Sequence, residues 1–296
     1  MTAARSLGLL AAMSDPVALV TAEAARSLDA DLPLLGAALE RLGVASEVVV
    51  WDDPTIVWGR FARIVVRSTW DYPGRLDAFL AWVAGTAELG PLDNPEQLLR
   101  WSLDKRYLAD LEARGVAIVP TRFCAPGQAP TLPDRPFVIK PSVGAGSVGV
   151  VRFVPGEQAQ AHEHVARLHA AGRVAMIQPY LAAVDQRGET ALVYFAGRFS
   201  HAIRKSAILV EGLKMVDGLY AAETITATVP TPAELALAEA ALAATPGRPL
   251  YARVDMIPGD DGAPRVLELE LCEPSLFLEH GEGAADRFAA AIAASL

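Results

Sequence analysis

Cysteine is scarce in this chain of 296 residues, which contains only Cys124 and Cys272. Two cysteines cannot form a disulfide framework, and neither lies in a CxxC or Cys/His spacing typical of a metal site. We therefore expect two free thiols and a cytoplasmic location, because the reducing cytosol keeps thiols reduced.

Basic charge and long apolar runs are also lacking. The chain has 26 Lys and Arg residues against 35 Asp and Glu residues, so its formal net charge is −9. Nucleic-acid-binding proteins usually carry a basic excess, so we expect no nucleic-acid partner. No apolar run approaches about 18 residues, so we expect no membrane span. An acidic protein can still bind a nucleotide when metal ions lie between its carboxylates and the phosphates.

The N-terminus carries only a weak imitation of a targeting signal. Leu7–Met13 follows Arg5 like the apolar part of a signal peptide, but Ser14–Pro16 cuts the run short. We interpret residues 1–12 as a loose extension. Met13 is a candidate for the true start, because the first strand-like run begins just after it.

The apolar content is sufficient for a substantial core, since 52% of the residues are hydrophobic. At about 150 residues per domain, the length predicts about two domains. Strand-like and helical runs alternate over roughly the first 95 residues, which is typical of a parallel α/β unit. The strand-like runs are Val17–Thr21, Glu47–Trp51 and Ile64–Arg67, and the helical runs are Ala30–Leu42 and Leu76–Val83.

The rest of the chain predicts a mixed α+β arrangement with antiparallel hairpins. Asn94 followed by Pro95 predicts a helix start with Asn94 as the N-cap, and Thr231–Glu234 predicts a capping box. The expected strand pairs are Phe137–Lys140 with Val148–Val154, Thr190–Phe195 with Arg198–Ile203, and Tyr251–Ile257 with Arg265–Leu271.

A glycine-rich segment, Gly144–Gly149, matches the pattern GxGxxG. A dinucleotide-binding fold requires a helix directly after these glycines, but a strand-like run follows here, which disfavours an NAD-dependent oxidoreductase. A glycine loop between two strands can fold over phosphates, because its backbone N–H groups are accessible. Lys140 precedes the loop and would suit a phosphate. The alternatives are a plain flexible hairpin and a solvated lysine.

Three carboxylates near the C-terminus form the strongest chemical signal. Glu268 and Glu270 lie two apart on one predicted strand and therefore share a face, while Leu267, Leu269 and Leu271 are expected to face the other way. Together with Asp255 on the neighbouring strand, such a group needs a cation, and oxygen ligands suit Mg²⁺. An exposed acidic strand face is the alternative.

Two further segments follow predicted strands. Gln178–Leu181 contains Pro179, which leaves backbone groups free for an adenine edge, although it also suits an ordinary strand end. Arg67–Trp70 ends a strand of the α/β unit, where such sheets bind ligands. Arg67 there is expected to clamp a substrate carboxylate. The alternative is a surface arginine beside a packing tryptophan.

In this order the motifs resemble the ATP-grasp superfamily of carboxylate–amine ligases, from about Asp93 to the C-terminus. The resemblance implies a fold of class α/β plus α+β. It implies an N-terminal parallel α/β domain at residues 1–95, a central nucleotide-binding lobe at 96–180 and a metal- and substrate-binding lobe at 181–296. The two mixed lobes would enclose ATP.

The resemblance also implies roles for individual residues. The phosphates would contact two lysines and the glycine loop, namely Lys105, Lys140, Gly144, Gly146, Ser147 and Gly149. The adenine would contact the hinge residues Gln178, Tyr180 and Leu181, and the ribose would contact Asp185. Asp255, Glu268 and Glu270 match the magnesium ligands, although many members have Asn at the last position. Arg253 would steady the tetrahedral intermediate, with Lys205 or Arg204 as a second cation. Arg67, Ser68 and Ser275 are expected to contact the substrate.

Four runs are similar to the O-ureidoserine cyclo-ligases of D-cycloserine biosynthesis: Asp104–Leu108, Gly188–Thr190, Ser200–Ile203 and Glu268–Ser275. The implied activity uses ATP and Mg²⁺, with two ions expected and Mn²⁺ as a substitute. A carboxylate becomes an acyl phosphate, and an amine of a second molecule or of the same molecule displaces phosphate. The partners would be a small carboxylate and an amine, and a homo-oligomer is allowed. A nucleotide-binding module without turnover is the alternative. It would lack a metal-binding carboxylate or a phosphate-binding lysine, but all of these residues are present here, which favours the enzyme.

Overall fold

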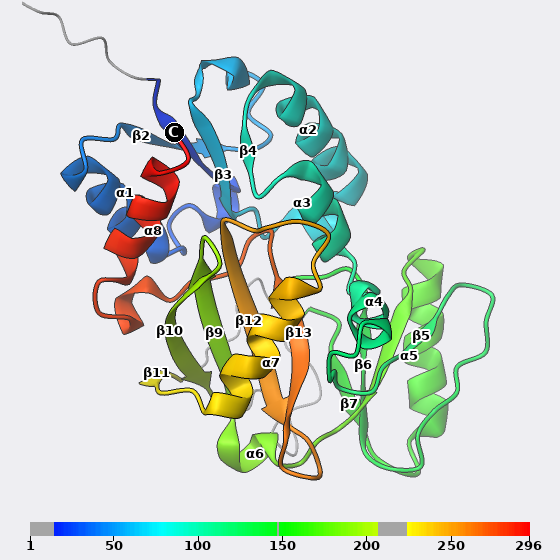
Figure 1. Cartoon of the computed structure of the whole chain (residues 1–296). Helices are drawn as coiled ribbons and strands as arrows, with labels where there is room; N and C mark the ends of the chain where they lie inside the picture. The colour runs from blue at the N-terminus through cyan, green and yellow to red at the C-terminus, as the bar shows by residue number, and fades with distance from the viewer. Residues whose placement is uncertain (1–14, 147, 207–223) are drawn as a thin grey trace, which may run out of the picture.

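Three β-sheets organise the chain, which we describe from a computed structural model covering residues 15–146, 148–206 and 224–296. The predictions for Met1–Ala12, Met13 and Ser147 lie outside these residues. In Figure 1 the N-terminal sheet lies at the top and the C-terminal sheet lies below it. The central sheet lies beside the C-terminal one.

The N-terminal sheet is entirely parallel, as the alternation of strands and helices predicts. Its strands, in spatial order, are β2 (Ser46–Val50), β1 (Val17–Thr21), β3 (Arg63–Ser68) and β4 (Leu92–Asp93). Every residue of β1 is buried, which is why this strand reads as an unbroken apolar run. The helices of this unit are α1 (Asp31–Arg41) and α2 (Leu76–Leu89).

The last helix of the chain returns to this N-terminal unit. Helix α8 (Ala284–Ala293) packs against α1, as the red and blue helices of Figure 1 show. Its Phe288 stacks on Phe195 with ring centroids 4.6 Å apart and meets Tyr251 edge-on at 5.6 Å. The C-terminal helix therefore joins the N-terminal sheet to the C-terminal sheet.

The central sheet is antiparallel and carries the glycine loop. Its strands are β5 (Arg122–Cys124), β8 (Ala175–Pro179), β6 (Phe137–Pro141) and β7 (Val151–Phe153), and α5 (Gln158–Ala170) packs against it. The loop joins β6 to β7, as predicted. Strand β7 begins at Val151 rather than Val148, because Gly149 adopts a left-handed conformation with φ of 76° that ends the loop.

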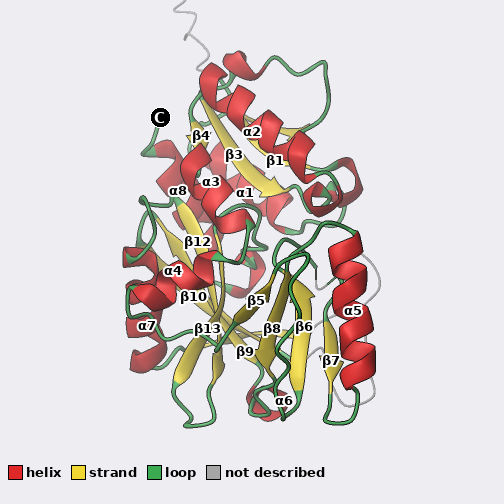
Figure 2. Cartoon of the chain, turned by 90° about the vertical axis from the view of Figure 1, so that its right-hand side faces the viewer, coloured by secondary structure: helices red, strands yellow, loops and turns green. Residues whose placement is uncertain are grey.

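The C-terminal sheet is also antiparallel. Its strands, in spatial order, are β11 (Ile225–Thr228), β10 (Arg198–Lys205), β9 (Glu189–Phe195), β12 (Tyr251–Pro258) and β13 (Pro264–Glu270). The remaining helices are α3 (Glu96–Leu103), α4 (Tyr107–Ala113), α6 (Val184–Arg187) and α7 (Pro232–Ala243). Helix α7 begins with the predicted capping box between Thr231 and Glu234. Figure 2 shows α4 and α7 beside this sheet and α5 on the far side of the central one.

Asn94 is not the predicted N-cap. Helix α3 begins at Glu96, so the cap position is Pro95, and no side chain at that position caps the helix by a hydrogen bond. The Asn94 amide instead donates to the carbonyls of Tyr251 and Leu271, at 2.9 and 2.7 Å. Buried backbone groups need partners, and Asn94 satisfies those of two distant strand ends, so tertiary contacts override the local capping pattern.

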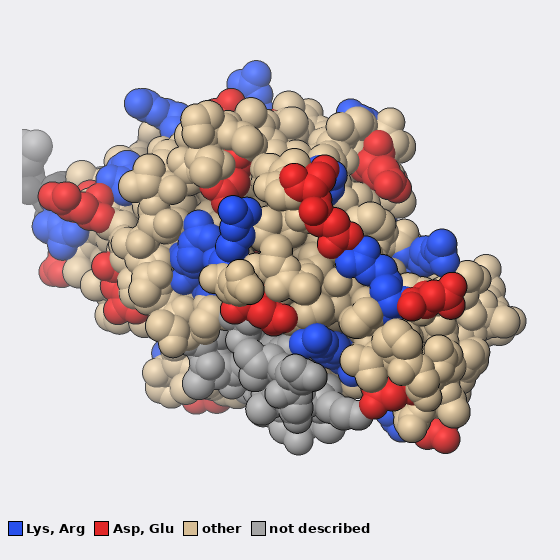
Figure 3. Space-filling view, turned by 90° about the horizontal axis from the view of Figure 1, so that it is seen from below, with Lys and Arg blue, Asp and Glu red and all other residues tan. Residues whose placement is uncertain are grey.

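The surface carries mixed charge. On the described part of the face shown in Figure 3, acidic and basic side chains lie in small, interspersed groups. Among the described residues, no helix has both the length and the apolar character needed to cross a membrane.

Candidate active site

A cavity of about 250 Å³ lies between the central and the C-terminal sheets. Strands β6 and β8 and the glycine loop line one side, and β9, β12 and β13 line the other. Most of the predicted site residues line this cavity: Lys105, Lys140, Gly144, Gly146, Gln178, Tyr180, Leu181, Lys205, Arg253, Asp255, Glu268, Glu270 and Ser275. Segments that are far apart in the sequence, from Trp70 to Phe277, therefore converge on one pocket.

Lys105 connects the glycine loop to β13. Its ammonium donates to the Gly144 carbonyl and lies 2.8 Å from Glu268 Oε1. Burial alone would lower the pKa of Lys105, but the ion pair with Glu268 raises it above its usual value. The side chain is therefore a fixed positive charge beneath the glycine loop.

Lys140 stands in the same pocket without such a partner. Its ammonium has no hydrogen bond or ion pair with any described residue. Burial lowers the pKa of Lys140, with Glu268 partly opposing the shift. Because a buried cation is costly without an opposite charge, this position fits an anionic ligand.

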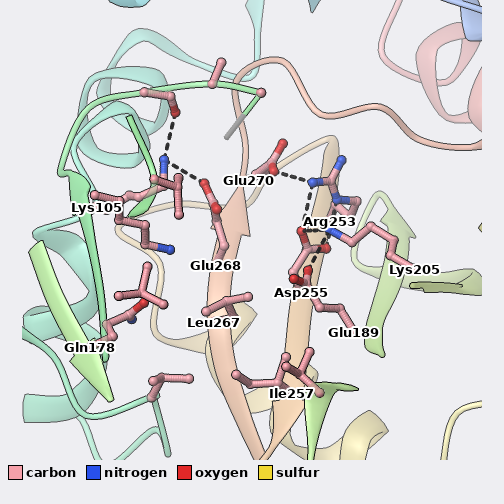
Figure 4. Close-up of a pocket in the computed structure, with 18 of the residues that line it drawn as sticks. Lys105, Gln178, Glu189, Lys205, Arg253, Asp255, Ile257, Leu267, Glu268 and Glu270 are labelled. Carbon is pink, nitrogen blue, oxygen red and sulfur yellow. Dashed lines mark hydrogen bonds and ion pairs between the residues drawn. The ribbon is translucent and has the colours of Figure 1, made fainter. Parts of the chain in front are cut away.

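Arg253 and Asp255 lie two apart on β12 and share a face, as expected for a strand. The Arg253 guanidinium donates to Asp255 through Nε at 2.9 Å and through Nη2 at 2.8 Å, and it also pairs with Glu270. Lys205 contacts Asp255 at 2.9 Å and Glu189 at 3.0 Å (Figure 4). Burial would raise the pKa of Asp255, but Arg253 and Lys205 together hold it well below its usual range.

The pKa values of the two glutamates of β13 are shifted in opposite directions. Burial and the neighbouring carboxylates raise the pKa of Glu270 to about 8 against the opposing effect of Arg253. Burial also acts on Glu268, but Lys105 and Lys140 lower its pKa. The positive charge of Arg253 is therefore not enough to offset the effects of burial and of the neighbouring carboxylates on Glu270.

The predicted metal ligands suit an ion that is shared between the protein and a phosphate. They do not suit an ion that is enclosed by protein groups alone. No group of three His, Cys, Asp or Glu residues within the described ranges is placed to hold a metal by itself. Lys205 and Arg253 occupy the Asp255 oxygens, whereas Glu268 and Glu270 face the cavity. Mg²⁺ usually takes one or two carboxylates and completes its shell with water and phosphate, which agrees with this donor set.

The prediction for Leu267 is wrong, because it lines the cavity beside Glu268 instead of facing away from it. Asp255 pairs with Glu268 while Met256 pairs with Val266, so Leu267 is the extra residue of a β-bulge. A bulge breaks the two-residue alternation and re-aims one side chain. Leu267 and Ile257 consequently form an apolar floor below the charged cluster (Figure 4).

The hinge segment lies at the apolar end of the cavity. Gln178 donates to the Thr121 hydroxyl at 2.9 Å, and the Tyr180 N–H donates to the Pro136 carbonyl at 2.8 Å. The Leu181 N–H has no partner among the described residues. Asp185, the predicted ribose contact, does not line the cavity, and its carboxylate accepts a hydrogen bond from the Tyr180 hydroxyl.

Arg67 and Ser68 lie outside the cavity. Arg67 is not a surface residue either, because its side chain is fully buried and donates to the Pro274 carbonyl at 2.8 Å. The Ser68 hydroxyl shares a hydrogen bond of 2.7 Å with Thr21. Their neighbour Trp70 does line the cavity, so the end of β3 reaches the site through a different side chain.

The chain is similar along its whole length to a protein of cycloserine biosynthesis. It is 41% identical over 309 residues to the cycloserine biosynthesis protein DcsG of Streptomyces lavendulae, covering 98% of this chain and 99% of the relative. Residues 17–94 match the family described as the N-terminal domain of D-cycloserine synthetase DcsG. The chain belongs to the DcsG family.

Solved structures agree with this assignment. The crystal structure of D-cycloserine synthetase DcsG is similar with a TM-score of 0.87 and 40% identity, covering 94% of this chain and 98% of that chain. The ATP-grasp ligase PsnB in complex with a minimal precursor has a TM-score of 0.65 at 16% identity, covering 96% of this chain and all of the other. D-alanine–D-alanine ligase from Bacillus anthracis in complex with ATP has a TM-score of 0.64 at 15% identity, covering 95% and 96%. At such identities the last two matches support the fold alone.

As a member of the DcsG family, the protein is an ATP-dependent C–N ligase with the ATP-grasp fold. The predicted fold class and the predicted superfamily are confirmed. The alternatives of an oxidoreductase and of a binding module without turnover lose their support.

Sequence reasoning did not single out several residues that line the cavity in this DcsG-family protein: Trp70, Glu189, Leu267, Glu273 and Phe277. Glu273 had a signal, since it lies in the sharp turn that follows the two glutamates. Phe277 has a left-handed backbone with φ of 50°, and its ring lies 5.4 Å from the Arg253 guanidinium. Neither property is visible in the sequence.

Proposed function

We propose that this protein uses ATP to convert a carboxylate of an O-ureido amino acid into an acyl phosphate and then closes a ring. A carboxylate oxygen attacks the γ-phosphorus and ADP leaves. The nitrogen bonded to the side-chain oxygen then attacks the acyl carbon, loses its proton and displaces phosphate. The match to D-cycloserine synthetase DcsG over both chains nearly end to end carries this proposal.

In this proposal Lys105 and Lys140 neutralise the phosphates. Lys140 lacks a partner of its own among the described residues, and Lys105 sits directly beneath Gly144. Gly144 and Gly146 leave room for phosphate oxygens to approach the backbone, because they carry no side chains. Positioning and charge neutralisation are the main contributions of a protein to phosphoryl transfer.

The apolar end of the cavity suits the adenine. The Leu181 N–H, which has no partner within the described ranges, is a donor for a ring nitrogen, and Leu267 and Ile257 offer apolar surface to the ring. The predicted ribose role of Asp185 would require its carboxylate to exchange the Tyr180 hydroxyl for the sugar.

Glu268, Glu270 and Asp255 would hold magnesium. The ion would shield the charge of the phosphates and lower the barrier to attack on the γ-phosphorus. The pKa of Glu270 is raised although Arg253 is beside it, so a further positive charge there would stabilise the carboxylate, which supports this assignment. Asp255 would contribute while Arg253 and Lys205 keep its carboxylate ionised and oriented.

Arg253 is the proposed cation for the tetrahedral intermediate. Its guanidinium is always charged and presents several donors in one plane. One of these, Nη1, donates to the Ser275 carbonyl at 2.9 Å, which places the guanidinium beside a proposed substrate contact. Lys205 would support it from β10, which lies on the other side of β9 from β12.

The test supplies O-ureido-D-serine as the only carboxylate, with ATP and Mg²⁺. We expect release of ADP and a ring-closed product, with or without the carbamoyl group, in the mass spectrum. The same assay with two equivalents of D-alanine tests intermolecular ligation and should give no dipeptide. Dipeptide formation without any cyclic product would contradict the proposal.

A further inference from the structure

One carboxylate of the cavity lacks a cationic partner. Glu268 pairs with Lys105, Glu189 pairs with Lys205, and both Asp255 and Glu270 pair with Arg253. Glu273 lines the same cavity but forms no ion pair with any residue in the described ranges. Its position therefore differs from that of every other acidic residue there.

The polar side chains directly beside the Glu273 carboxylate are uncharged. The carboxylate is partly buried, and its neighbours are the Cys272 thiol and the Tyr72 hydroxyl. Lys105 acts on it only from a distance, since the ammonium already binds Glu268 and Gly144. A carboxylate that is withdrawn from water without a cation is unfavourable unless a ligand supplies one.

The backbone around Glu273 is fixed in place. Trp70 Nε1 donates to the Glu273 carbonyl at 3.0 Å, and Arg67 donates to the next carbonyl, that of Pro274, at 2.8 Å. Asp31 accepts the Leu276 N–H at 2.6 Å. These side chains come from the N-terminal unit and hold the segment rigidly, which is what a preorganised binding group requires.

Glu273 also lies at the substrate end of the cavity. Its near neighbours along the chain contact Arg253: the Ser275 carbonyl accepts from the guanidinium, and the Phe277 ring lies 5.4 Å from it. Leu181 of the hinge instead packs with Ile257 and Leu267. A substrate carboxylate that reacts beside Arg253 has its α-ammonium group one carbon away. We infer that Glu273 binds the α-ammonium group of the amino-acid substrate and so selects amino acids over simple carboxylic acids. This inference rests on the proposed function.

The experiment compares O-ureido-D-serine with its deamino analogue, 3-(ureidooxy)propanoic acid, in the wild type and in Glu273→Gln. Losing a hydrogen bond to a charged group should lower kcat/KM for the amino acid by about 10- to 100-fold. The value for the deamino analogue should stay within about threefold, and the KM values for ATP and Mg²⁺ should not change. Glu273→Asp, which keeps the charge, should recover part of the loss.

Glu279→Gln is the matched control, because Glu279 is an exposed glutamate six residues further along the same segment. It should match the wild type with both substrates. Equal losses with both substrates, or a raised KM for Mg²⁺, would make Glu273 a metal ligand and overturn the inference. Unchanged discrimination in Glu273→Gln would overturn it as well. A wild type that turns over neither substrate would instead contradict the proposed function, and the inference would fall with it.

Discussion

Single charges in this pocket are rarely independent of one another. Arg253 holds both Asp255 and Glu270, and Lys205 holds both Asp255 and Glu189. Removing one member of a buried ion pair leaves the other uncompensated, which usually costs more than the pair contributes. Isosteric substitutions are therefore the most informative ones at this site.

Glu268→Gln keeps the shape of the side chain and removes its charge. Lys105 then retains the Gly144 carbonyl but loses its ionic partner, and the proposed metal site loses a ligand. We expect ADP release to fall by about 10²-fold or more. The protein should still fold, with a lower melting temperature because the buried Lys105 charge is left uncompensated. Glu96→Gln, which removes an exposed charge paired with Arg100, is the control and should behave like the wild type. Normal ADP release in Glu268→Gln would refute the metal assignment.

His201 makes stability depend on pH. Burial lowers its pKa below the ordinary value of 6.5, against the opposing hydrogen bond to the Leu276 carbonyl. Below pH 6.5 the unfolded chain therefore gains a proton at His201 that the folded protein resists. This contribution is complete above pH 6.5 and is lost as the pH falls towards the folded pKa.

Urea titrations at several pH values test this prediction. The free energy of unfolding should decline less between pH 7.5 and 5.5 in His201→Gln than in the wild type. His162→Gln changes an exposed histidine and should keep the wild-type profile. Identical profiles for the two variants would show that His201 titrates normally in the folded protein.

At the scale of elements, side chains hold the backbone of the segment from Glu273 to Leu278. Trp70, Arg67, Arg253 and His201 bind the carbonyls of its first four residues in turn. Asp31 accepts the N–H groups of Leu276 and Leu278. A loop with no regular structure thereby becomes a rigid wall of the cavity.

Asp31→Asn tests this wall. The asparagine keeps the size of the side chain, but the charge beside Arg67 is lost, and at most one oxygen still accepts. Breaking a buried pair in this way should cost about 3 kcal/mol in denaturant unfolding. Asp286→Asn, which breaks the exposed pair with Arg41, should cost less than about 1 kcal/mol. Equal costs for the two variants would mean that the segment does not depend on Asp31.

The turn before β9 depends on Gly188. This residue has φ of 65°, and a Cβ atom there would overlap the carbonyl oxygen of Lys205. Gly188→Ala should therefore cost about 2 kcal/mol or more in unfolding free energy and also lower activity, because Lys205 must shift. Gly197→Ala has a similar φ of 75° but open space around it, so it should cost only about 1 kcal/mol and preserve activity. If both substitutions cost the same, the loss of stability would come from backbone strain alone, and the predicted overlap with the Lys205 carbonyl would be refuted.

At the scale of the whole molecule, the sequence predicts elements better than their contacts. The limits of β1 and the capping box of α7 follow from local patterns and are confirmed. The position of Leu267 depends on a bulge against β12, and the burial of Arg67 depends on a carbonyl 207 residues away. Such features arise only when distant segments meet.

Convergence of distant segments is also what makes the site. The N-terminal unit supplies Trp70 and the clamp on the segment after β13, while the two antiparallel sheets supply the charges. The last helix closes the arrangement by packing on α1. Substrate chemistry therefore belongs to the assembled chain rather than to any one sheet.

The central claim is that the carboxylate is activated by phosphorylation. The most direct measurement uses substrate labelled with ¹⁸O in its carboxylate, with ATP and Mg²⁺, and follows the label by mass spectrometry. We predict one ¹⁸O atom in the released inorganic phosphate, in equal amount to ADP and to the cyclic product. Unlabelled phosphate, or the formation of AMP and pyrophosphate, would contradict the account.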